Sequence, residues 1–195
     1  MTTIFLDTET TGLEPSACSI IQLSGIIRNG DEEETFDFRI RPYRGETITS
    51  NATSKTGLTQ DIIMQYPDQK EAYTQFIELM KKYRVGATFN EKAYIIGYNS
   101  DFDMRFLRSW FEFNGNTRFG WMHWWPDIDV ARLAALYYMG RRGNIKSFKL
   151  VDVYAAVFGK YYENAHDSMA DVIATKELFE FFTRKFLFDP MENSK

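Results

Sequence analysis

The sequence predicts an α/β fold in which a mixed sheet is covered by helices. Three strand-like segments follow one another at the front of the chain, and strand-length apolar segments then alternate with segments of helical periodicity. Consecutive strands followed by strands separated by helices are typical of a mixed sheet with helices packed on it. A chain of 195 residues can bury a substantial core. We therefore expect one domain over residues 1–188 and a short loose tail over 189–195.

The front of the chain is expected to form three strands, because it is rich in β-branched and large apolar residues. These strands are predicted over residues 3–6, 20–27 and 34–40. Asn29 and Gly30 lie between the last two strands, and this residue pair is typical of a tight hairpin turn. The stretch 51–61 is polar and rich in turn residues, so it is expected to be a connection.

The remainder of the chain is expected to alternate between helices and strands. Apolar residues recur at helical spacing over 68–83 and again over 101–113, where Phe102, Phe106 and Trp110 align. The apolar run between these helices predicts a fourth, buried strand. This strand, a fifth strand and three further helices are predicted over residues 93–98, 126–130, 131–138, 149–158 and 165–186.

Charge and cysteine content limit the classes of function. The net charge of −4 argues against a protein that coats nucleic acid with a broad basic face, but not against one that grips a few nucleotides. Cys18 is the single cysteine, so it has no partner for an internal disulfide and fits a reducing compartment. No apolar stretch approaches the roughly 20 residues of a membrane span. We therefore expect a cytoplasmic protein with no membrane partner.

Two acidic residues at the end of the first strand are the first sign of a chemical site. Asp7 and Glu9 are two positions apart, so on a strand their side chains point to the same side. They stand at the carboxyl end of the strand, where open α/β sheets bind their ligands. A hydrolytic site with two metal ions needs several carboxylates, so one pair is insufficient. On its own, the pair is better explained as a solvated strand face.

Two later strings hold further candidate ligands. Asn99 and Asp103 are four residues apart after the fourth strand, so they are expected to share one face in the first turn of the following helix. His166 precedes the last helix and Asp171 lies near its start, so both can reach a common point. An N-capping Asp167 with a solvated Asp171 explains the last string equally well.

Taken together, the three strings resemble the motifs of a known enzyme family. DTETTGL, YNSDFD and HDSMAD, in this order, are similar to the three exonuclease motifs of the DEDDh (DnaQ-like) family of 3′-5′ exonucleases. That family includes the proofreading epsilon subunit of bacterial DNA polymerase III. The resemblance runs over residues 3–182. Asp167 stands where a tyrosine-type relative would carry Tyr, which selects the histidine subtype, whereas Tyr98 and Thr56 stand where the family often has His.

The resemblance implies a ribonuclease H-like mixed sheet of five strands flanked by helices. It also implies that four carboxylates bind two Mg²⁺ or Mn²⁺ ions; these are Asp7, Glu9, Asp103 and Asp171. His166 would be the general base. Residues implied to hold the terminal nucleotide are Thr10, Thr11, Leu13, Asn99 and Phe102. Backbone groups of Thr10 and Thr11 would contact the terminal sugar. Leu13 and Phe102 would pack near the last bases or belong to the core. Gly12 would let the turn approach the end of the nucleic-acid strand.

The function that this resemblance implies is a metal-dependent 3′-5′ exonuclease. It would release nucleoside 5′-monophosphates from the 3′ ends of single-stranded DNA or RNA, with DNA favoured. The alternatives are a catalytically silent binding module or polymerase accessory subunit, and an RNA-trimming exoribonuclease. The segment after Phe186 is shorter than the polymerase-binding extension of the epsilon subunit. We therefore expect a free-standing trimming or repair nuclease, with a polymerase or repair partner as the other possibility.

Three further features stand outside these motifs. Asp129, near Asp127, is expected to cap a helix rather than to join the site. The aromatic string 120–125 is interpreted as packing in preference to a stacking platform for bases. Four cations flank a glycine-containing loop, where a solvated loop and a contact with a phosphate backbone are equally good explanations. These cations are Arg141, Arg142, Lys146 and Lys149.

Overall fold

A five-stranded mixed sheet forms the centre of the computed structural model, which describes residues 1–164 and 167–187. In spatial order β3-β2-β1-β4-β5, the described strands are Glu32–Arg39, Ile20–Asn29, Thr2–Thr10, Tyr94–Gly97 and Ile128–Asp129. β1, β2 and β3 pair antiparallel, whereas β4 pairs parallel with β1 and β5 pairs parallel with β4. The expected mixed five-stranded sheet flanked by helices is therefore confirmed.

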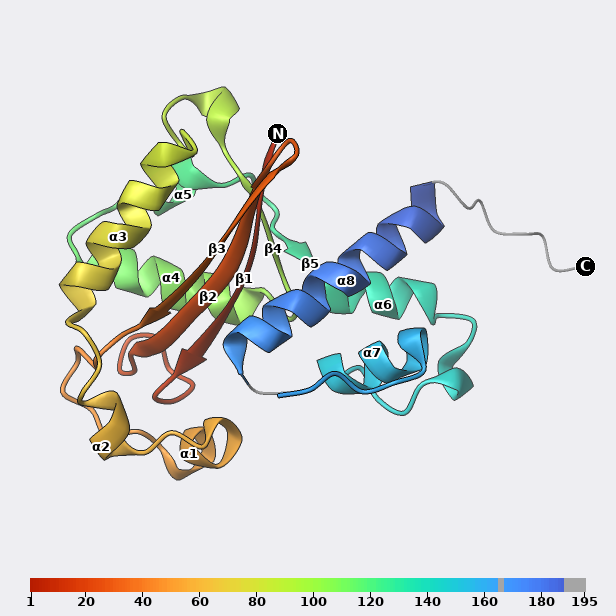
Figure 1. The fold of residues 1–195 in the computed structure, drawn as a ribbon, viewed down its shortest axis with the longest axis horizontal. Coiled ribbons are helices and arrows are strands. Elements are labelled where there is room, and N and C mark those ends of the chain that lie inside the picture. Colours follow the sequence, from red (N-terminus) through yellow and green to blue (C-terminus); the bar gives the residue numbers. More distant parts are fainter. Residues whose placement is uncertain (165–166, 188–195) are drawn as a thin grey trace, which may run out of the picture.

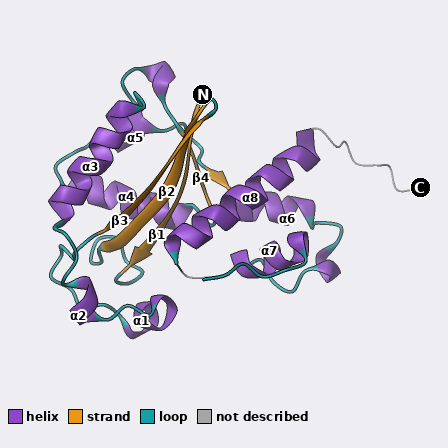
Figure 2. Cartoon of the chain, viewed as in Figure 1, coloured by secondary structure: helices purple, strands orange, loops and turns teal. Residues whose placement is uncertain are grey.

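Helices cover both faces of this sheet (Figure 1, Figure 2). The α-helices are α1 Ser50–Thr56, α2 Gln60–Ile63, α3 Gln69–Lys82, α4 Asp101–Phe113, α5 Phe119–Met122, α6 Val130–Tyr137, α7 Leu150–Phe158 and α8 Ser168–Leu187. Short 3-10 turns occupy Phe89–Glu91 (η1) and Arg142–Asn144 (η2). In the described residues, no helix is both long enough and apolar enough to span a bilayer.

The apolar run at the start of β1 is continuous because both faces of the strand are buried. Ile4 and Leu6 belong to the core beneath α3 and α4, together with Phe76 and Trp110. Phe5 points the other way, into the core formed by α6, α7 and α8. The alternation of a strand therefore distributes three successive apolar residues between two cores.

Short helices are the main difference from the predicted elements. The connection expected over 51–61 is largely helical, since it overlaps most of α1 and the first two residues of α2. The hydroxyl of Thr49 accepts a hydrogen bond from the backbone N–H of Ala52, and Gly57 ends α1 at φ 72°. None of the residues of α1 is buried, so this helix lacks the apolar periodicity from which helices are predicted. The beginning of the last predicted helix at 165–166 and the predicted tail over 189–195 lie outside the described residues.

The topology brings the candidate strings to one edge of the sheet. β1 and β4 are parallel, so their carboxyl ends lie at the same edge. β1 extends through the whole string DTET, and α4 begins four residues after β4. The hydroxyl of Ser168, the first residue of α8, donates to the carbonyl oxygen of Asp7 at 3.0 Å. The starts of α4 and α8 are thus held next to the end of β1.

Candidate active site

Four carboxylates from three elements lie within electrostatic range of one another. Asp7 and Glu9 come from β1, Asp103 from the first turn of α4 and Asp171 from the first turn of α8. Burial raises the pKa of Asp7 well above its usual value, and the charges of Asp103, Glu9 and Asp171 raise it further. Burial also raises the pKa of Glu9 to about 8, again with contributions from Asp171 and Asp103. This cluster stabilises bound protons or cations.

Thr8, between the two acids of β1, holds the carboxylate of Asp103. Its backbone N–H and its hydroxyl both donate to Oδ1 of Asp103, at 2.9 Å and 2.7 Å. Asp103 is only 3% exposed, and burial raises its pKa to about 7 although these two hydrogen bonds act in the opposite direction. Thr8 was not predicted as a site residue, since a threonine in a strand is ordinary. Its contact crosses 95 positions of the chain.

Tyr162 plays the corresponding part at Asp171. The phenol hydroxyl donates to Oδ1 of Asp171 at 2.7 Å, and the ring packs edge-on against Tyr154 at 5.1 Å. Burial and the neighbouring carboxylate raise the pKa of Tyr162, so this phenol remains a hydrogen-bond donor at neutral pH. Sequence reasoning missed this residue because it precedes the motif and its partner is nine positions away.

The start of α8 confirms the capping role predicted for Asp167 in the string HDSMAD. Oδ1 of Asp167 accepts from the backbone N–H groups of Met169 and Ala170 at 3.2 and 3.3 Å, as an N-capping residue does. The charge of Asp171, one turn later, nevertheless raises the pKa values of Asp7 and Glu9. Capping by Asp167 therefore does not keep Asp171 away from these two acids. His166, the expected general base, lies outside the described residues.

Asn99 does not occupy the position expected for it. α4 begins at Asp101, and Asn99 lies before the helix in the left-handed region at φ 59°, so it does not share a helical face with Asp103. Asparagine tolerates this conformation better than most residues. The backbone N–H of Asn99 donates to Asp129 at 2.9 Å. Asp129 also accepts from the N–H of Ala131, which confirms it as the cap of α6.

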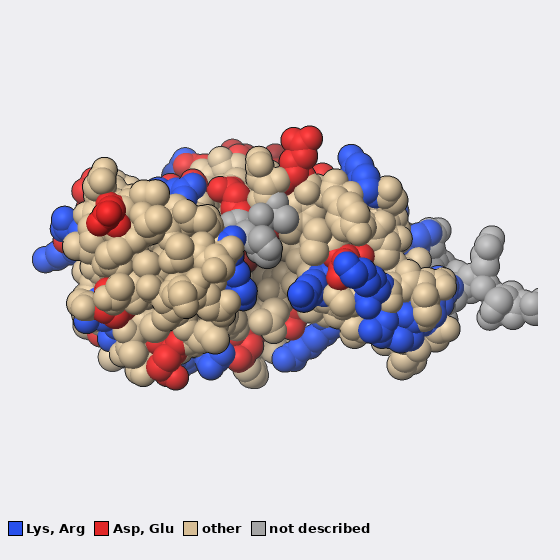
Figure 3. Space-filling model, turned by 90° about the horizontal axis from the view of Figure 1, so that it is seen from below, with Lys and Arg blue, Asp and Glu red and all other residues tan. Residues whose placement is uncertain are grey.

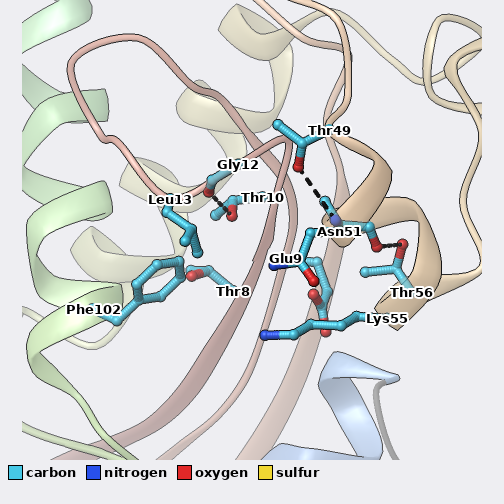
Figure 4. A pocket seen from close by; sticks show the side chains of 11 residues that line it. Thr8, Glu9, Thr10, Gly12, Leu13, Thr49, Asn51, Lys55, Thr56 and Phe102 are labelled. Carbon is cyan, nitrogen blue, oxygen red and sulfur yellow. Dashed lines mark hydrogen bonds between the residues drawn. The ribbon is translucent and has the colours of Figure 1, made fainter.

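A cavity of about 180 Å³ opens beside the carboxylates (Figure 4). Its walls come from the end of β1 and the turn after it, from α1 with its capping residue, and from the start of α4. The lining residues are Thr8, Glu9, Thr10, Gly12, Leu13, Thr49, Asn51, Ala52, Lys55, Thr56 and Phe102. Glu9 thus belongs both to the acidic cluster and to the cavity wall.

Apolar side chains form one side of this cavity. Leu13 and Phe102 lie side by side in Figure 4. Leu13 is 67% exposed, so it is not a core residue. Phe102 is half-buried and its ring lies 4.9 Å from that of Phe106, which anchors it. The two residues therefore present an apolar surface toward the opening of the cavity.

The turn after β1 is held together internally. The Thr10 hydroxyl donates to the carbonyl of Gly12 at 2.6 Å. Thr11 is fully buried and does not line the cavity; its N–H donates to Ser19 and its carbonyl accepts from Thr49. The expectation that its backbone meets a sugar is therefore wrong, because both groups already have partners. A Cβ on Gly12 would lie 2.7 Å from Sγ of Cys18, so this glycine permits close packing of the turn itself.

Two residues of α1 complete the cavity opposite Leu13. The side chain of Lys55 extends toward Glu9, and its charge lowers the pKa of that carboxyl, against the effect of burial (Figure 4). The Thr56 hydroxyl donates to the carbonyl of Ala52 at 3.0 Å and accepts from the N–H of Leu58 at 3.1 Å. Thr56 therefore fixes the end of α1 where the family often has His. Lys55 was not predicted, since the stretch was expected to be a connection.

The aromatic string lies at the other end of the sheet. His123 forms a bridge with Ala93, which precedes β4, whereas the carboxylates follow its carboxyl end. Trp124 packs edge-on against Phe89 at 5.3 Å, while Trp121 and Trp125 are 57% and 79% exposed. The string is therefore partly packing and partly surface, remote from the cavity.

The donor set fits hard divalent cations, which prefer carboxylate oxygens. As the side chains stand, no three His, Cys, Asp or Glu residues within 1–164 and 167–187 are close enough together to hold an ion. The charges of these carboxylates nevertheless act on one another, and the raised pKa values of Asp7, Glu9 and Asp103 are those of buried acids with too little positive charge nearby. An ion bound here would have to draw the carboxylates inward.

Solved structures with the same fold include exonuclease I of E. coli. The complex of that enzyme with a dT13 oligonucleotide aligns with a TM-score of 0.73 and 25% identity, over 96% of this chain and 42% of that chain. Its zinc-bound complex with single-stranded DNA aligns with a TM-score of 0.73 at 24% identity, over 97% and 41% of the two chains, which shows the fold alone. The predicted ribonuclease H-like fold is confirmed.

Sequence relatives include bacterial PolC-type DNA polymerase III. The protein of Thermotoga petrophila is 31% identical over 110 residues, 56% of this chain and 7% of that protein. The protein of Pediococcus pentosaceus is 27% identical over 182 residues, 93% of this chain and 11% of that protein. The chain thus spans about a tenth or less of these relatives. The RNase_T family model, described as "Exonuclease", matches residues 4–179. Together with the three acidic motifs, this match establishes that the chain belongs to the DnaQ-like 3′-5′ exonuclease family.

Proposed function

We propose that the chain is a metal-dependent 3′-5′ exonuclease that acts on single-stranded nucleic acid, with DNA favoured, and releases nucleoside 5′-monophosphates. The observation that carries this proposal is that the charges of Asp103, Glu9 and Asp171 raise the pKa of Asp7 beside a cavity with an apolar wall. Exonuclease I, which shares the fold, has been crystallised with dT13. That complex favours single-stranded DNA as the substrate.

The proposed ligands of two Mg²⁺ or Mn²⁺ ions are Asp7, Glu9, Asp103 and Asp171. When bound, such ions lower the pKa of a water molecule and stabilise the leaving 3′-oxygen. Thr8 and Tyr162 orient two of these carboxylates through the hydrogen bonds described above.

The cavity is proposed to hold the terminal nucleotide. Leu13 and Phe102 would pack on its base, and Thr10 shapes the turn against which the sugar lies. An imidazole nitrogen of His166 is proposed to accept the proton of the attacking water, a role that rests on the family resemblance. An imidazole with an ordinary pKa is neutral at physiological pH and can accept that proton.

We further propose that residues 1–188 act as one exonuclease domain in the cytoplasm. The single cysteine fits a reducing compartment. Relatives of similar sequence include PolC-type DNA polymerase III. If the protein does not act alone, we therefore propose that it acts in a polymerase or repair complex.

A 5′-labelled single-stranded oligonucleotide tests the proposal. With Mg²⁺ or Mn²⁺, the expected product is a ladder that shortens from the 3′ end and disappears in the Asp103→Asn variant. Matched DNA and RNA oligonucleotides then give the substrate preference. Undegraded substrate with both metals would overturn the proposal, and a melting temperature that does not respond to Mn²⁺ would then indicate a silent module.

A further inference from the structure

We propose that the segment 141–149, here called the basic segment, binds the phosphate backbone of the nucleic-acid strand beyond the terminal nucleotide. This inference rests on the proposed function. The basic segment joins α6 to α7 and carries four exposed cations: Arg141, Arg142, Lys146 and Lys149. The chain as a whole has a net charge of −4, so this concentration of positive charge runs against its overall composition.

The basic segment is a loop whose conformation is fixed by a buried anchor and by internal contacts. Ile145 is 5% exposed and anchors it in the core beneath α6, α7 and α8. The Arg142 guanidinium donates to the carbonyl of Ile145 at 2.7 Å and lies over the ring of Phe148 at 5.2 Å. The backbone N–H of Lys149 donates to the Ser147 hydroxyl at 3.1 Å. A loop held in this way loses little conformational entropy when a ligand binds.

A hydrogen bond ties the basic segment to the edge of the sheet that carries the carboxylates. The hydroxyl of Tyr98 donates to the carbonyl of Phe148 at 2.7 Å. Tyr98 directly follows β4 and stands five residues before Asp103. It also occupies the position at which the family motif often has His. The residue that departs from the motif therefore holds the basic segment in place.

The surface places this charge beside the approach to the site. In Figure 3, Lys and Arg side chains gather over the face that carries α7 and the preceding segment, on one side of a hollow in the surface. A strand entering the cavity has to pass four carboxylates that repel its phosphates. Cations on a neighbouring surface offset that repulsion, because backbone phosphates are the groups that Arg and Lys bind most readily in nucleic acids.

Two of the four cations are available for a ligand. Lys146 lies 3.6 Å from the carboxylate of Asp152, and Arg142 is engaged within the loop. Within the part of the chain that the structure describes, Arg141 and Lys149 form no ion pair. The Arg141 guanidinium lies over the ring of Tyr137, a neighbour on the same surface, and donates to its hydroxyl at 3.4 Å. These two residues are therefore the ones to remove.

The test compares two doubly substituted variants with equal loss of charge. One carries Arg141→Gln and Lys149→Gln in the basic segment. The control carries Lys81→Gln and Arg118→Gln, two exposed cations near the end of α3 and before α5, away from the carboxyl end of β1. Melting temperatures check that both variants fold. Fluorescence anisotropy in EDTA measures the affinity for labelled dT20 and dT3 over a range of NaCl, without hydrolysis.

Loss of two phosphate contacts should reduce the slope of log affinity against log salt by about 1.4, at about 0.7 per contact for a single strand. When salt is raised from roughly 50 to 200 mM, the affinity for dT20 should fall in both proteins. The fold decrease should be about seven times larger for the parent than for the basic-segment variant. The control variant should keep the parental slope, and dT3, which extends only two nucleotides beyond the terminal one, should discriminate much less between the variants.

A parental affinity and salt slope in the basic-segment variant would overturn the inference, as would an equal change in the control. Failure of the parent to bind dT20 would also overturn it and would leave an acidic protein as the class of partner for this surface. Hydrolysis decides the proposed function separately. A parent that binds dT20 through the basic segment but degrades nothing would refute the exonuclease and retain the strand-binding surface.

Discussion

Replacing Glu9 with Gln removes one charge from the acidic cluster while preserving the size of the side chain. In the metal-free protein, Glu9 has a pKa raised from 4.5 to about 8, first by burial and then by Asp171 and Asp103. A carboxyl group whose pKa is raised on folding contributes stability that is present below its unfolded value and is lost as pH rises through its folded value. The stability associated with Glu9 is therefore lost between about pH 4.5 and pH 8.

The size of this effect follows from the two pKa values. One pKa unit corresponds to about 1.4 kcal/mol, so the full difference is on the order of 4 to 5 kcal/mol above pH 8, and about 3 kcal/mol is already lost at pH 7. Asp171 and Asp103 contribute to this repulsion and remain in the variant, so we expect Glu9→Gln to recover about 2 kcal/mol at pH 8. For a chain of this size, that corresponds to a rise in melting temperature of roughly 4 to 8 °C.

Thermal unfolding in EDTA, followed by circular dichroism from about pH 5 to pH 9, measures this effect. The variant should melt above the parent at high pH and approach it at low pH. With millimolar Mn²⁺ the order should reverse, because the parent gains more from a bound cation than the variant does. Glu78→Gln, at an exposed position of α3, is the control. A Glu9→Gln variant that melts at or below the parent throughout, in EDTA, would refute the electrostatic reasoning.

Substitutions at three further positions test individual contacts of the site. Tyr162→Phe removes the hydrogen-bond donor to Asp171 and should weaken Mn²⁺ binding about tenfold in titration calorimetry. The melting temperature in EDTA should change little. An unchanged affinity for Mn²⁺ would exclude a positioning role for Tyr162. Lys55→Met should raise the KM for an oligonucleotide severalfold more than it lowers kcat, and Lys55→Arg should restore most of the KM; equal changes in KM and kcat would contradict a binding role. Leu13→Ala should weaken product inhibition by dTMP about fivefold, from a loss of ~1 kcal/mol of apolar contact, and leave the melting temperature unchanged, whereas a large drop in melting temperature would show that Leu13 supports the fold.

Much of the fold could be predicted from the sequence because its periodicities are strong. α4 coincides with the predicted helix over 101–113, where large apolar residues recur at helical spacing. α1 could not be predicted in the same way, since it buries none of its residues and its boundaries depend on the cap at Thr49 and on Gly57. The periodicity of apolar residues predicts a helix that packs on a core, but it cannot predict a helix that buries no side chains.

The candidate site shows the same division. The four acids could be proposed because strand alternation and helix starts bring them to one edge, and the structure places them within electrostatic range. Asn99 was misplaced because helical spacing was extended across two residues that precede the helix. Thr8 and Tyr162 could not be identified, since each acts on its carboxylate through a tertiary contact that no local pattern encodes.

The place of β1 in the sheet has a consequence for how the protein responds to ions. β1 is the central strand, hydrogen-bonded to β2 on one side and β4 on the other, and Phe5 is completely buried. Such a strand exchanges its amide hydrogens only when the whole molecule opens. A proton or cation bound at Asp7 therefore changes the free energy of global unfolding, and not only that of a local opening. In a peripheral loop, repulsion between such carboxylates would open the loop locally. Here Asp7 and Glu9 lie on β1, the central strand, which separates only on global unfolding.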